Sequence, residues 1–306
     1  MWNMEEKKIQ GFEQAVRVLP LRLRQEAMAL PADQRARVEE LRLRWGRPMA
    51  AVLPEGERPL GGEPVTGQEL EQLLELASRA SFHTVADQLR RGYLTVEGGH
   101  RVGLCGTAVV RDGELRGLRR LSSAAVRVAR QAVGAARPVS DRLLRREGTL
   151  YSTLILAPPG AGKTTLLRDL IRAASDGEGM TPHRVGVADE RGEVAALWNG
   201  RPQLEVGART DVLEGCPKAL ALMLLLRSMN PQVLAADEIT APEDVRALIS
   251  AAGCGAALLA TAHGWDRRDL EERPLYRELM AAGVFRRLVL IRREGDRRRY
   301  EVEELP

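Results

Sequence analysis

The chain has 306 residues, of which 44% are apolar and 29% are charged, a balance typical of soluble globular proteins. This length allows two domains, each with a core of its own. The formal net charge is only +4, so the composition does not indicate a nucleic-acid-binding protein. Nearly all cations are arginines, and the only lysines are Lys7, Lys8, Lys163 and Lys218.

The cysteines and the apolar runs indicate a reduced, intracellular chain. Cys105, Cys216 and Cys254 have neither metal-ligand spacing nor a disulfide pattern, so we expect small packing residues. The N-terminus has no apolar signal-peptide core. The longest apolar run, 219–226, is far shorter than the roughly 20 residues of a membrane span. We therefore expect a cytoplasmic protein that can still attach to a membrane through a partner.

The first part of the chain, residues 1–135, is predicted to be a small α+β domain. Periodicity and turn signals predict its elements in chain order. They are a helix over about 12–30, a strand-like segment at 38–53, a helix from a Thr66–Glu69 capping box to about Ser78, a helix at about 82–91, and alternating segments at 93–110 and 118–131. Residues 135–141 are expected to connect this domain to the second.

The second part, residues 136–306, alternates strands with helices, which predicts a mainly parallel sheet with helices on its faces. In such sheets ligands bind outside the carboxyl ends of the strands. The expected strands are 152–156, 184–189, 233–237 and 256–261, followed by a closing hairpin at 286–293 and 297–305.

A phosphate-binding loop follows the first of these strands, in APPGAGKTT at 157–165. The strict pattern is G-x-x-x-x-G-K-[ST], and here Ala157 takes the place of the first glycine. An apolar strand precedes the loop and a helix follows it, so the helix dipole adds to the anion site. The expected phosphate-binding residues are Pro158, Pro159, Gly160, Ala161, Gly162, Lys163, Thr164 and Thr165.

A pair of acids ends a second apolar strand, in QVLAADEIT at 232–240. Asp237 is placed to hold magnesium together with Thr164, and Glu238 to orient or deprotonate the attacking water. An apolar run followed by Asp-Glu is common by itself and can be a helix cap. Its position about 70 residues after a P-loop favours the functional interpretation.

Two weaker groups share this strand-end geometry. VADERGE places Asp189, Glu190 and Glu193 after one expected strand, and TAHG places His263 after another. An isolated acidic cluster is more often a solvated loop, and a lone histidine is more often a satisfied polar residue. Their common location favours a role near the γ-phosphate, with Asp189 as a further candidate magnesium ligand.

Taken together, these segments resemble the stage III sporulation AA family of endospore-forming bacteria, which is related to the type II/IV secretion ATPases. The resemblance covers nearly the whole chain, with matching segments in the right order. It departs from the family pattern at Ala157 and Thr240, where glycine is expected. The matching segments are 38–48, 92–109 and 116–130 in the first domain, and APPGAGKTTLLRDLIR, VADERGEVAA, VGARTDVLEGCPKA, LLRSMNPQVLAADEI and LATAHG in the second.

The resemblance implies a RecA-like P-loop motor domain behind a small N-terminal domain, assembled as a ring that is expected to be a hexamer. It implies magnesium-dependent ATP hydrolysis on the mother-cell side of a membrane-embedded channel complex that links to the forespore. By analogy with secretion ATPases, residues 189–193 correspond to an acidic box, Asp237 and Glu238 to the second nucleotide-binding motif, and His263 to a histidine box. Arg227 lies where the superfamily carries an arginine ahead of that motif.

A ring allows an arginine of a neighbouring subunit to neutralise charge during phosphoryl transfer. Arg209 is the first candidate, and Arg101, Arg119 and Arg120 of the first domain are others, although a surface or ion-paired arginine is an equally good interpretation of each. Two alternatives to the motor stay open: a nucleic-acid-associated P-loop ATPase, and an assembly scaffold that binds ATP with little turnover. Since no additional nucleic-acid-binding module is evident, we expect no nucleic-acid partner.

Overall fold

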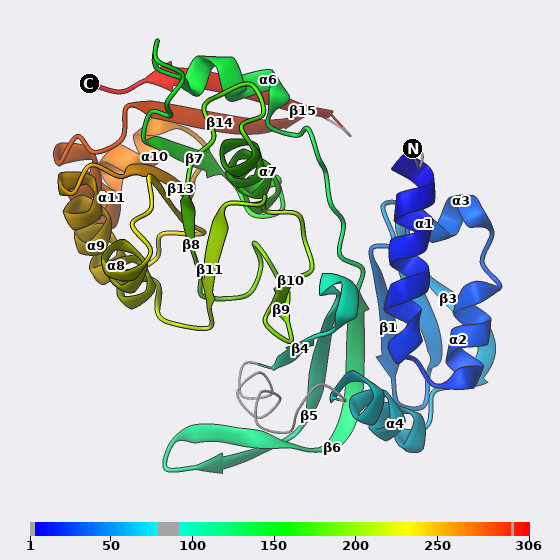
Figure 1. Cartoon of the computed structure of the whole chain (residues 1–306). Coiled ribbons are helices and arrows are strands. Elements are labelled where there is room, and N and C mark those ends of the chain that lie inside the picture. The colour runs from blue at the N-terminus through cyan, green and yellow to red at the C-terminus, as the bar shows by residue number, and fades with distance from the viewer. Residues whose placement is uncertain (1–3, 79–91, 295–296) are drawn as a thin grey trace. The chain divides into compact units, whose positions relative to one another are not determined.

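The computed structural model describes residues 4–78, 92–294 and 297–306, and the helix expected at 82–91 lies outside these ranges. The chain divides into two compact units (Figure 1). The first consists of Met1–Arg130 with Ala196–Gln203, and the second of Gln131–Ala195 with Leu204–Pro306. None of the described helices is long and apolar enough to cross a membrane.

The first unit is an antiparallel sheet with helices packed on one face. Its described strands pair in the order β3-β2-β1-β6-β5-β4. Phe12, Leu23 and Leu73 from the helices share one apolar core with Leu41 and Val126 of the sheet. Its elements are α1 (Met4–Ala15), η1 (Val16–Val18), α2 (Leu21–Met28), α3 (Ala32–Arg35), β1 (Glu40–Arg44), β2 (Pro48–Leu53), β3 (Gly56–Pro64), α4 (Gly67–Ser78), β4 (Tyr93–Thr95), η2 (Glu97–Gly99), β5 (Arg101–Arg111) and β6 (Glu114–Arg127).

The single helix expected over 12–30 is wrong: the chain instead forms α1, η1 and α2. The break lies at Leu19, which is extended with φ −81° and ψ 144°. Pro20 follows it, and the proline ring disfavours helical geometry in the residue before it. The capping box, by contrast, is confirmed, because the Thr66 amide donates to Glu69 Oε2 (2.9 Å) and the Glu69 amide donates to Thr66 Oγ1 (3.2 Å).

A short hairpin, β9 (Leu197–Trp198) and β10 (Arg201–Pro202), also belongs to the first unit although it follows the second unit's β8 in the chain. Beside it, the Gly98 amide donates to Gln203 Oε1 at 2.8 Å. The first unit is therefore completed by a segment distant in sequence.

The second unit is a mainly parallel sheet with described strands in the order β11-β8-β12-β13-β7-β14-β15, where only β15 runs antiparallel to its neighbour. The expected strands are confirmed to within one or two residues. The 135–141 connection contains a complete short helix, α6 (Arg137–Ser140). The elements are α6 (Arg137–Ser140), η3 (Asp141–Leu143), β7 (Thr153–Ala157), α7 (Lys163–Asp176), β8 (Val185–Asp189), β11 (Thr210–Glu214), α8 (Lys218–Ser228), β12 (Val233–Ala236), α9 (Pro242–Gly253), β13 (Ala257–His263), α10 (Arg267–Glu272), α11 (Pro274–Ala281), β14 (Arg287–Glu294) and β15 (Arg297–Glu304).

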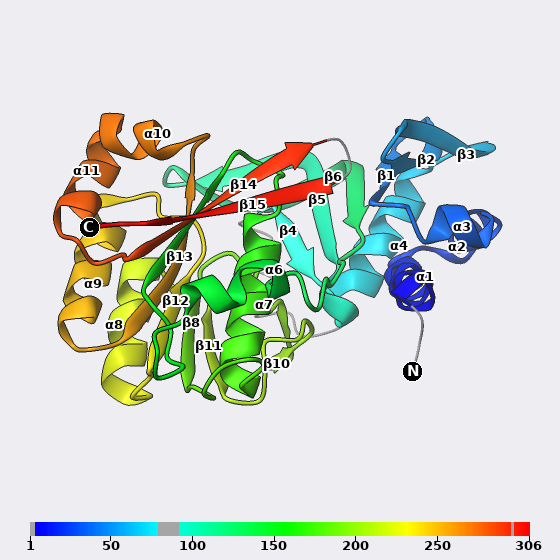
Figure 2. The ribbon, with the colours of Figure 1, turned by 90° about the horizontal axis from the view of Figure 1, so that it is seen from above.

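Helices cover both faces of this sheet (Figure 2). Alternate strand residues such as Ala236 and Ala260 share a core with α8, α9 and α11. Because neighbouring strand residues face opposite sides, Asp237, Thr261 and His263 fall on the other face, where α7 contacts β7, β8 and β13. Strand alternation thus directs the polar ends of β12 and β13 toward the helix that follows the P-loop.

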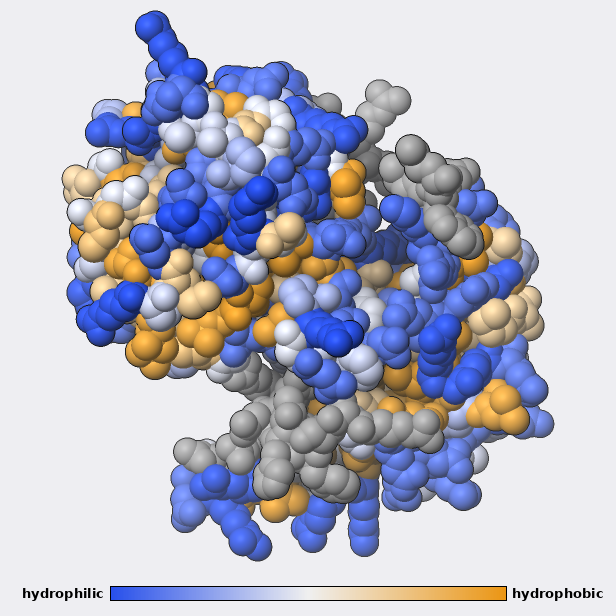
Figure 3. Space-filling model, in the orientation of Figure 1, coloured by the Kyte–Doolittle hydropathy of each residue, from blue (hydrophilic) through white to orange (hydrophobic). Residues whose placement is uncertain are grey.

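An apolar surface remains on α8. Leu220 is 53% exposed, Leu224 43% and Met229, directly after the helix, 40%. Figure 3 shows a hydrophobic area in this part of an otherwise largely hydrophilic face of the second unit. Contiguous apolar surface of this kind is typical of protein–protein contacts.

Candidate nucleotide site

The P-loop joins β7 to α7 and has the backbone geometry that its glycines permit. Gly160 and Gly162 have φ of +73° and +104°, a region that other residues rarely adopt. The first helical residue is Lys163, so the free amide groups of α7 face the loop. Its Nζ donates to the carbonyls of Ala157 (2.9 Å) and Pro158 (3.1 Å), which folds the side chain back over the loop.

Lys163 is 7% exposed, and its burial lowers the pKa of the ammonium group from the usual value. The carboxylates of Asp237 and Glu238 act in the opposite direction. A buried cation that is stabilised mainly by carbonyl oxygens is electrostatically suited to receive a stronger anion, such as a phosphate group.

The strand that carries the acid pair does not lie next to the P-loop strand. β13 separates β12 from β7. Thr261 of β13, fully buried, donates its hydroxyl to Asp237 Oδ1 (2.6 Å) and accepts the amide hydrogen of Glu238 (2.8 Å). The hydroxyl of Thr164 donates to the other oxygen, Asp237 Oδ2, at 2.7 Å. A single carboxylate therefore links the start of α7 to two strands.

His263, at the end of β13, lies between a cation and an anion. Its Nδ1 is 2.9 Å from Lys163 Nζ, and its Nε2 is 2.9 Å from Glu238 Oε1. Since the ammonium group can only donate, Nδ1 must accept, and the ring hydrogen on Nε2 is then donated to the carboxylate. The contacts fit a neutral imidazole in one tautomer, bridging the P-loop lysine and the acid of the second motif.

Glu238 has a positive φ of +51°, uncommon for a residue with a side chain. The Thr261 hydroxyl and a backbone bond from Ile239 to the Thr261 carbonyl (2.8 Å) hold this conformation. Positive φ in a non-glycine residue costs free energy and is found disproportionately at functional sites. Its carboxylate also pairs with Arg191, at 3.0 Å from Nη1 to Oε2.

Asp189 is the buried acid of the acidic segment. Asp189 is 1% exposed and accepts the amide hydrogens of Glu193 (2.8 Å), Val194 (3.0 Å) and Ala195 (2.9 Å). Burial raises the pKa of this carboxyl group, and the three amides oppose the shift. The described contacts make Asp189 the anchor of the 190–195 loop, and its role as a magnesium ligand stays a prediction.

Arg168 of α7 supports the same loop from the other side. It is 7% exposed, and its guanidinium donates to the carbonyls of Val194 (2.6 Å) and Glu193 (2.5 Å). The loop is thus held by a carboxylate on its amides and a guanidinium on its carbonyls.

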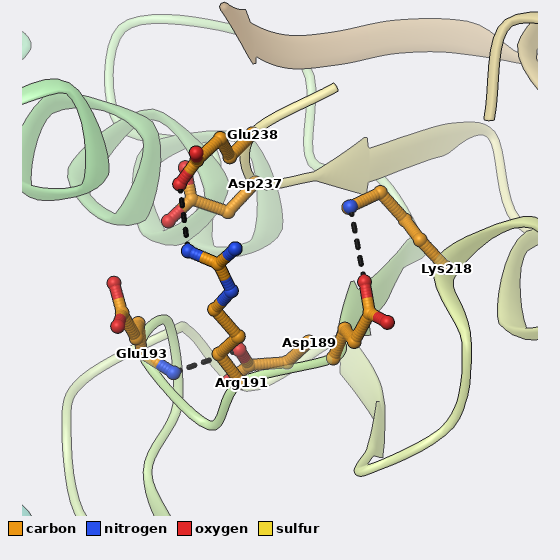
Figure 4. A pocket seen from close by; sticks show the side chains of 7 residues that line it. Asp189, Arg191, Glu193, Lys218, Asp237 and Glu238 are labelled. Carbon is orange, nitrogen blue, oxygen red and sulfur yellow. Dashed lines mark hydrogen bonds and ion pairs between the residues drawn. The ribbon is translucent and has the colours of Figure 1, made fainter. Parts of the chain in front are cut away.

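A small pocket lies at the carboxyl ends of β8 and β12 (Figure 4). Lys218, the first residue of α8, is 4% exposed and lies 3.1 Å from Glu190 Oε2 and 3.4 Å from Asp244 Oδ2. Asp244 in turn accepts the amides of Thr240 and Ala241, at the start of α9. The lining residues are Asp189, Glu190, Arg191, Glu193, Lys218, Asp237 and Glu238.

Two arginines of the sequence hypothesis lie elsewhere. Arg209 precedes β11, at the amino end of the parallel strands, where its Nη1 donates to the Ser175 carbonyl near the end of α7 (3.0 Å). Arg227 is exposed in the last turn of α8, which leads to the amino end of β12. Both are therefore at the edge of the sheet opposite the P-loop, and a role for either in a neighbouring subunit's site stays a prediction.

Three residues of this site were not singled out from the sequence as site residues. Thr261 lies two residues before His263 and therefore on the same face of β13. Arg191 lies inside the acidic segment. Lys218 is one of four lysines in the chain and begins a helix, where the helix dipole disfavours a cation. This unfavourable position could have indicated that Lys218 is a site residue.

The order of the sheet, with the P-loop after β7 and the acid pair after β12, defines a RecA-like P-loop fold. The same fold occurs in the pilus retraction motor PilT solved with bound ADP (TM-score 0.59, 16% identity, 88% of this chain and 80% of that one) and in the ATPase DotB of Legionella pneumophila (0.55, 15%, 87% and 76%). At these identities the likeness shows the fold alone.

The chain belongs to the family described as sporulation stage III, protein AA, whose model matches residues 8–302. It is 39% identical over 286 residues to stage III sporulation protein AA of Bacillus subtilis strain 168, covering 91% of this chain and 90% of that protein. The resemblance seen in the sequence is confirmed.

Replacement of Thr261 by valine is expected to reduce stability and turnover together. Valine keeps the shape but removes the hydroxyl that pairs with Asp237 and with the Glu238 amide. Leaving such groups unpaired should lower the free energy of unfolding by about 1–3 kcal/mol. Denaturant unfolding and an ATPase assay measure the two effects.

Thr153→Val is the matched control, because Thr153 is also fully buried in a strand of the same sheet, and its hydroxyl donates to the Tyr151 carbonyl (2.8 Å) at the opposite edge. Its turnover should stay near that of the unmodified chain. Equal turnover in the two variants would contradict the assigned role of Thr261.

Proposed function

We propose that this protein is a magnesium-dependent ATPase that works as a ring motor during endospore formation. The observation that carries the proposal is the 2.7 Å hydrogen bond from Thr164 to Asp237, which joins the phosphate loop to the acid of the second motif. Lys163, on the same loop, is buried and rests on carbonyl oxygens. The arrangement supports nucleotide binding with the phosphates on residues 158–165.

The donor set at this point fits magnesium. Thr164 supplies a hydroxyl oxygen and Asp237 supplies carboxylate oxygens, the hard donors that Mg²⁺ prefers. Magnesium ordinarily keeps several waters and binds one or two protein oxygens beside the phosphates. When bound, it would offset negative charge on the β- and γ-phosphates.

Three side chains then have distinct tasks in hydrolysis. Lys163 leaves the Ala157 and Pro158 carbonyls and pairs with the outer phosphates. Glu238 orients water for in-line attack and accepts its proton. His263, which touches both Lys163 and Glu238, reports phosphate occupancy from one to the other.

The proposed assembly is a homo-oligomeric ring, with a hexamer expected from the relationship to secretion ATPases. The exposed apolar residues of α8 support contact with another protein surface. Within the cell the proposal places the ring in the mother cell, peripherally bound to membrane-embedded channel proteins. Hydrolysis would drive a domain movement that is passed on to this complex.

Native mass measurement on the purified chain tests the assembly, with turnover measured on the same sample. A defined oligomer that forms or tightens with magnesium and ATP, and that hydrolyses ATP, is the expected result. A monomer that hydrolyses ATP would contradict the proposed ring assembly and would still support the ATPase activity. Tight ATP binding with no product would instead support the scaffold alternative, and stimulation by DNA or RNA that weakens with salt would support the nucleic-acid alternative.

A further inference from the structure

Arg191 occupies a special place among the groups that line the pocket at β8 and β12. The described lining residues comprise five carboxylates (Asp189, Glu190, Glu193, Asp237 and Glu238) and two cations (Arg191 and Lys218). In Figure 4, Arg191 extends from the acidic loop toward Asp237 and Glu238. Its guanidinium therefore lies against the acid pair on which hydrolysis is proposed to depend.

The side chains of these two cations differ in solvent exposure. The Lys218 side chain is 4% exposed and is in contact with two carboxylates, so it is fixed in place. The Arg191 side chain is 56% exposed and makes its 3.0 Å contact with a Glu238 side chain that is 24% exposed. Exposed ion pairs of this kind contribute little to stability and rearrange easily. Arg191 can therefore exchange the Glu238 carboxylate for another anion by side-chain rotation.

The base of the side chain, by contrast, is fixed. Residue 191 belongs to the loop that Asp189 and Arg168 hold by hydrogen bonds to residues 193–195. Gly192 has φ +61° and closes a turn to the Asp189 carbonyl (3.3 Å). The backbone thus holds the base of the Arg191 side chain in place, while the guanidinium group can still move.

Glu238 cannot act fully on water while its carboxylate is neutralised by a guanidinium. An arginine is always charged, and its planar fork matches a phosphate as well as it matches a carboxylate. A terminal phosphate near Lys163 would compete for Arg191, because His263 links Lys163 to Glu238, the carboxylate that Arg191 contacts (2.9 Å on each side of the ring).

We propose that Arg191 senses the γ-phosphate within its own subunit: it is paired with Glu238 without ATP and transfers to the γ-phosphate when ATP binds. The transfer frees Glu238 to orient water only when the third phosphate is present. This inference rests on the proposed ATPase function and adds a discrimination between ATP and ADP to it.

The test compares Arg191→Ala, Arg191→Lys and Arg246→Ala in the full chain. Arg246 is the control, since its side chain is 59% exposed and is paired with Glu243 on α9. Affinities are measured with magnesium for ADP and for the non-hydrolysable β,γ-imido analogue of ATP. We expect Arg191→Ala to weaken binding of the analogue about tenfold or more and to leave ADP binding nearly unchanged. Arg191→Lys should restore part of the loss, and Arg246→Ala should have no effect.

Equal losses for both nucleotides, or no loss for either, would overturn the role of Arg191 while leaving the ATPase proposal intact. If the unmodified chain binds neither nucleotide, the proposed function itself fails and the role of Arg191 fails with it. ADP binding by Arg191→Ala also shows that the variant is folded.

Discussion

Lys163→Ala is expected to remove ATP hydrolysis almost completely, by at least about 100-fold, which is the scale seen when one charge-stabilising donor is deleted from an active site. Lys163 begins α7, and its ammonium group rests on loop carbonyls and on His263. Alanine leaves the outer phosphates without this cation and His263 without its donor. Turnover with magnesium is measured at saturating ATP, and nucleotide affinity in parallel.

Lys7→Ala provides the control, because Lys7 is exposed on α1, and full activity is expected there. Folding of the Lys163 variant is checked by its unfolding transition. Since the lysine is buried with a lowered pKa, its removal should not itself unfold the domain. Magnesium-dependent turnover that persists in Lys163→Ala would refute the site assignment.

Glu238→Gln is expected to retain ATP and to hydrolyse it about 100- to 10,000-fold more slowly, the range typical of a lost general base. Glutamine preserves the size of the side chain and can still accept the hydrogen from His263 Nε2. The variant keeps Asp237 and Thr164, so magnesium and phosphate contacts should survive. Equilibrium binding and single-turnover hydrolysis separate the two effects.

Glu243→Gln is the matched control: Glu243 lies on α9 in the same unit, and its side chain is 62% exposed. It should leave both binding and turnover unchanged. Loss of ATP binding in Glu238→Gln would instead assign Glu238 a structural role, consistent with its positive φ and its contact with Thr261.

Local patterns in the sequence were sufficient to predict the strands β7, β8, β12 and β13 of the second unit. Each of these is a short apolar run, and burial of both faces of a central strand imposes such a run whatever the strand order. The P-loop was equally readable, because Gly160 and Gly162 meet a local backbone requirement. The prediction of one helix over 12–30 was wrong for a similarly local reason. Pro20 disfavours helical geometry at Leu19, and this effect outweighs the apolar periodicity.

The order of the strands could not be predicted from such local patterns. β13 follows β12 and α9 in the chain, yet it lies between β12 and β7. That placement alone brings Thr261 to Asp237 and His263 to Lys163, across 24 and 100 residues of sequence. The same limit applies to 196–203, which joins the first unit from within the second half of the chain.

The phosphate loop, the acid pair and the histidine at strand ends could all be predicted from the sequence, because each is a local motif with its own backbone requirement. Which of these side chains meet depends on the tertiary structure. It brought together Lys163, His263, Glu238 and Arg191, and it placed Arg209 and Arg227 at the opposite edge of the sheet. The physical reason is that strand pairing is a long-range choice, whereas turns, caps and alternation are settled within a few residues.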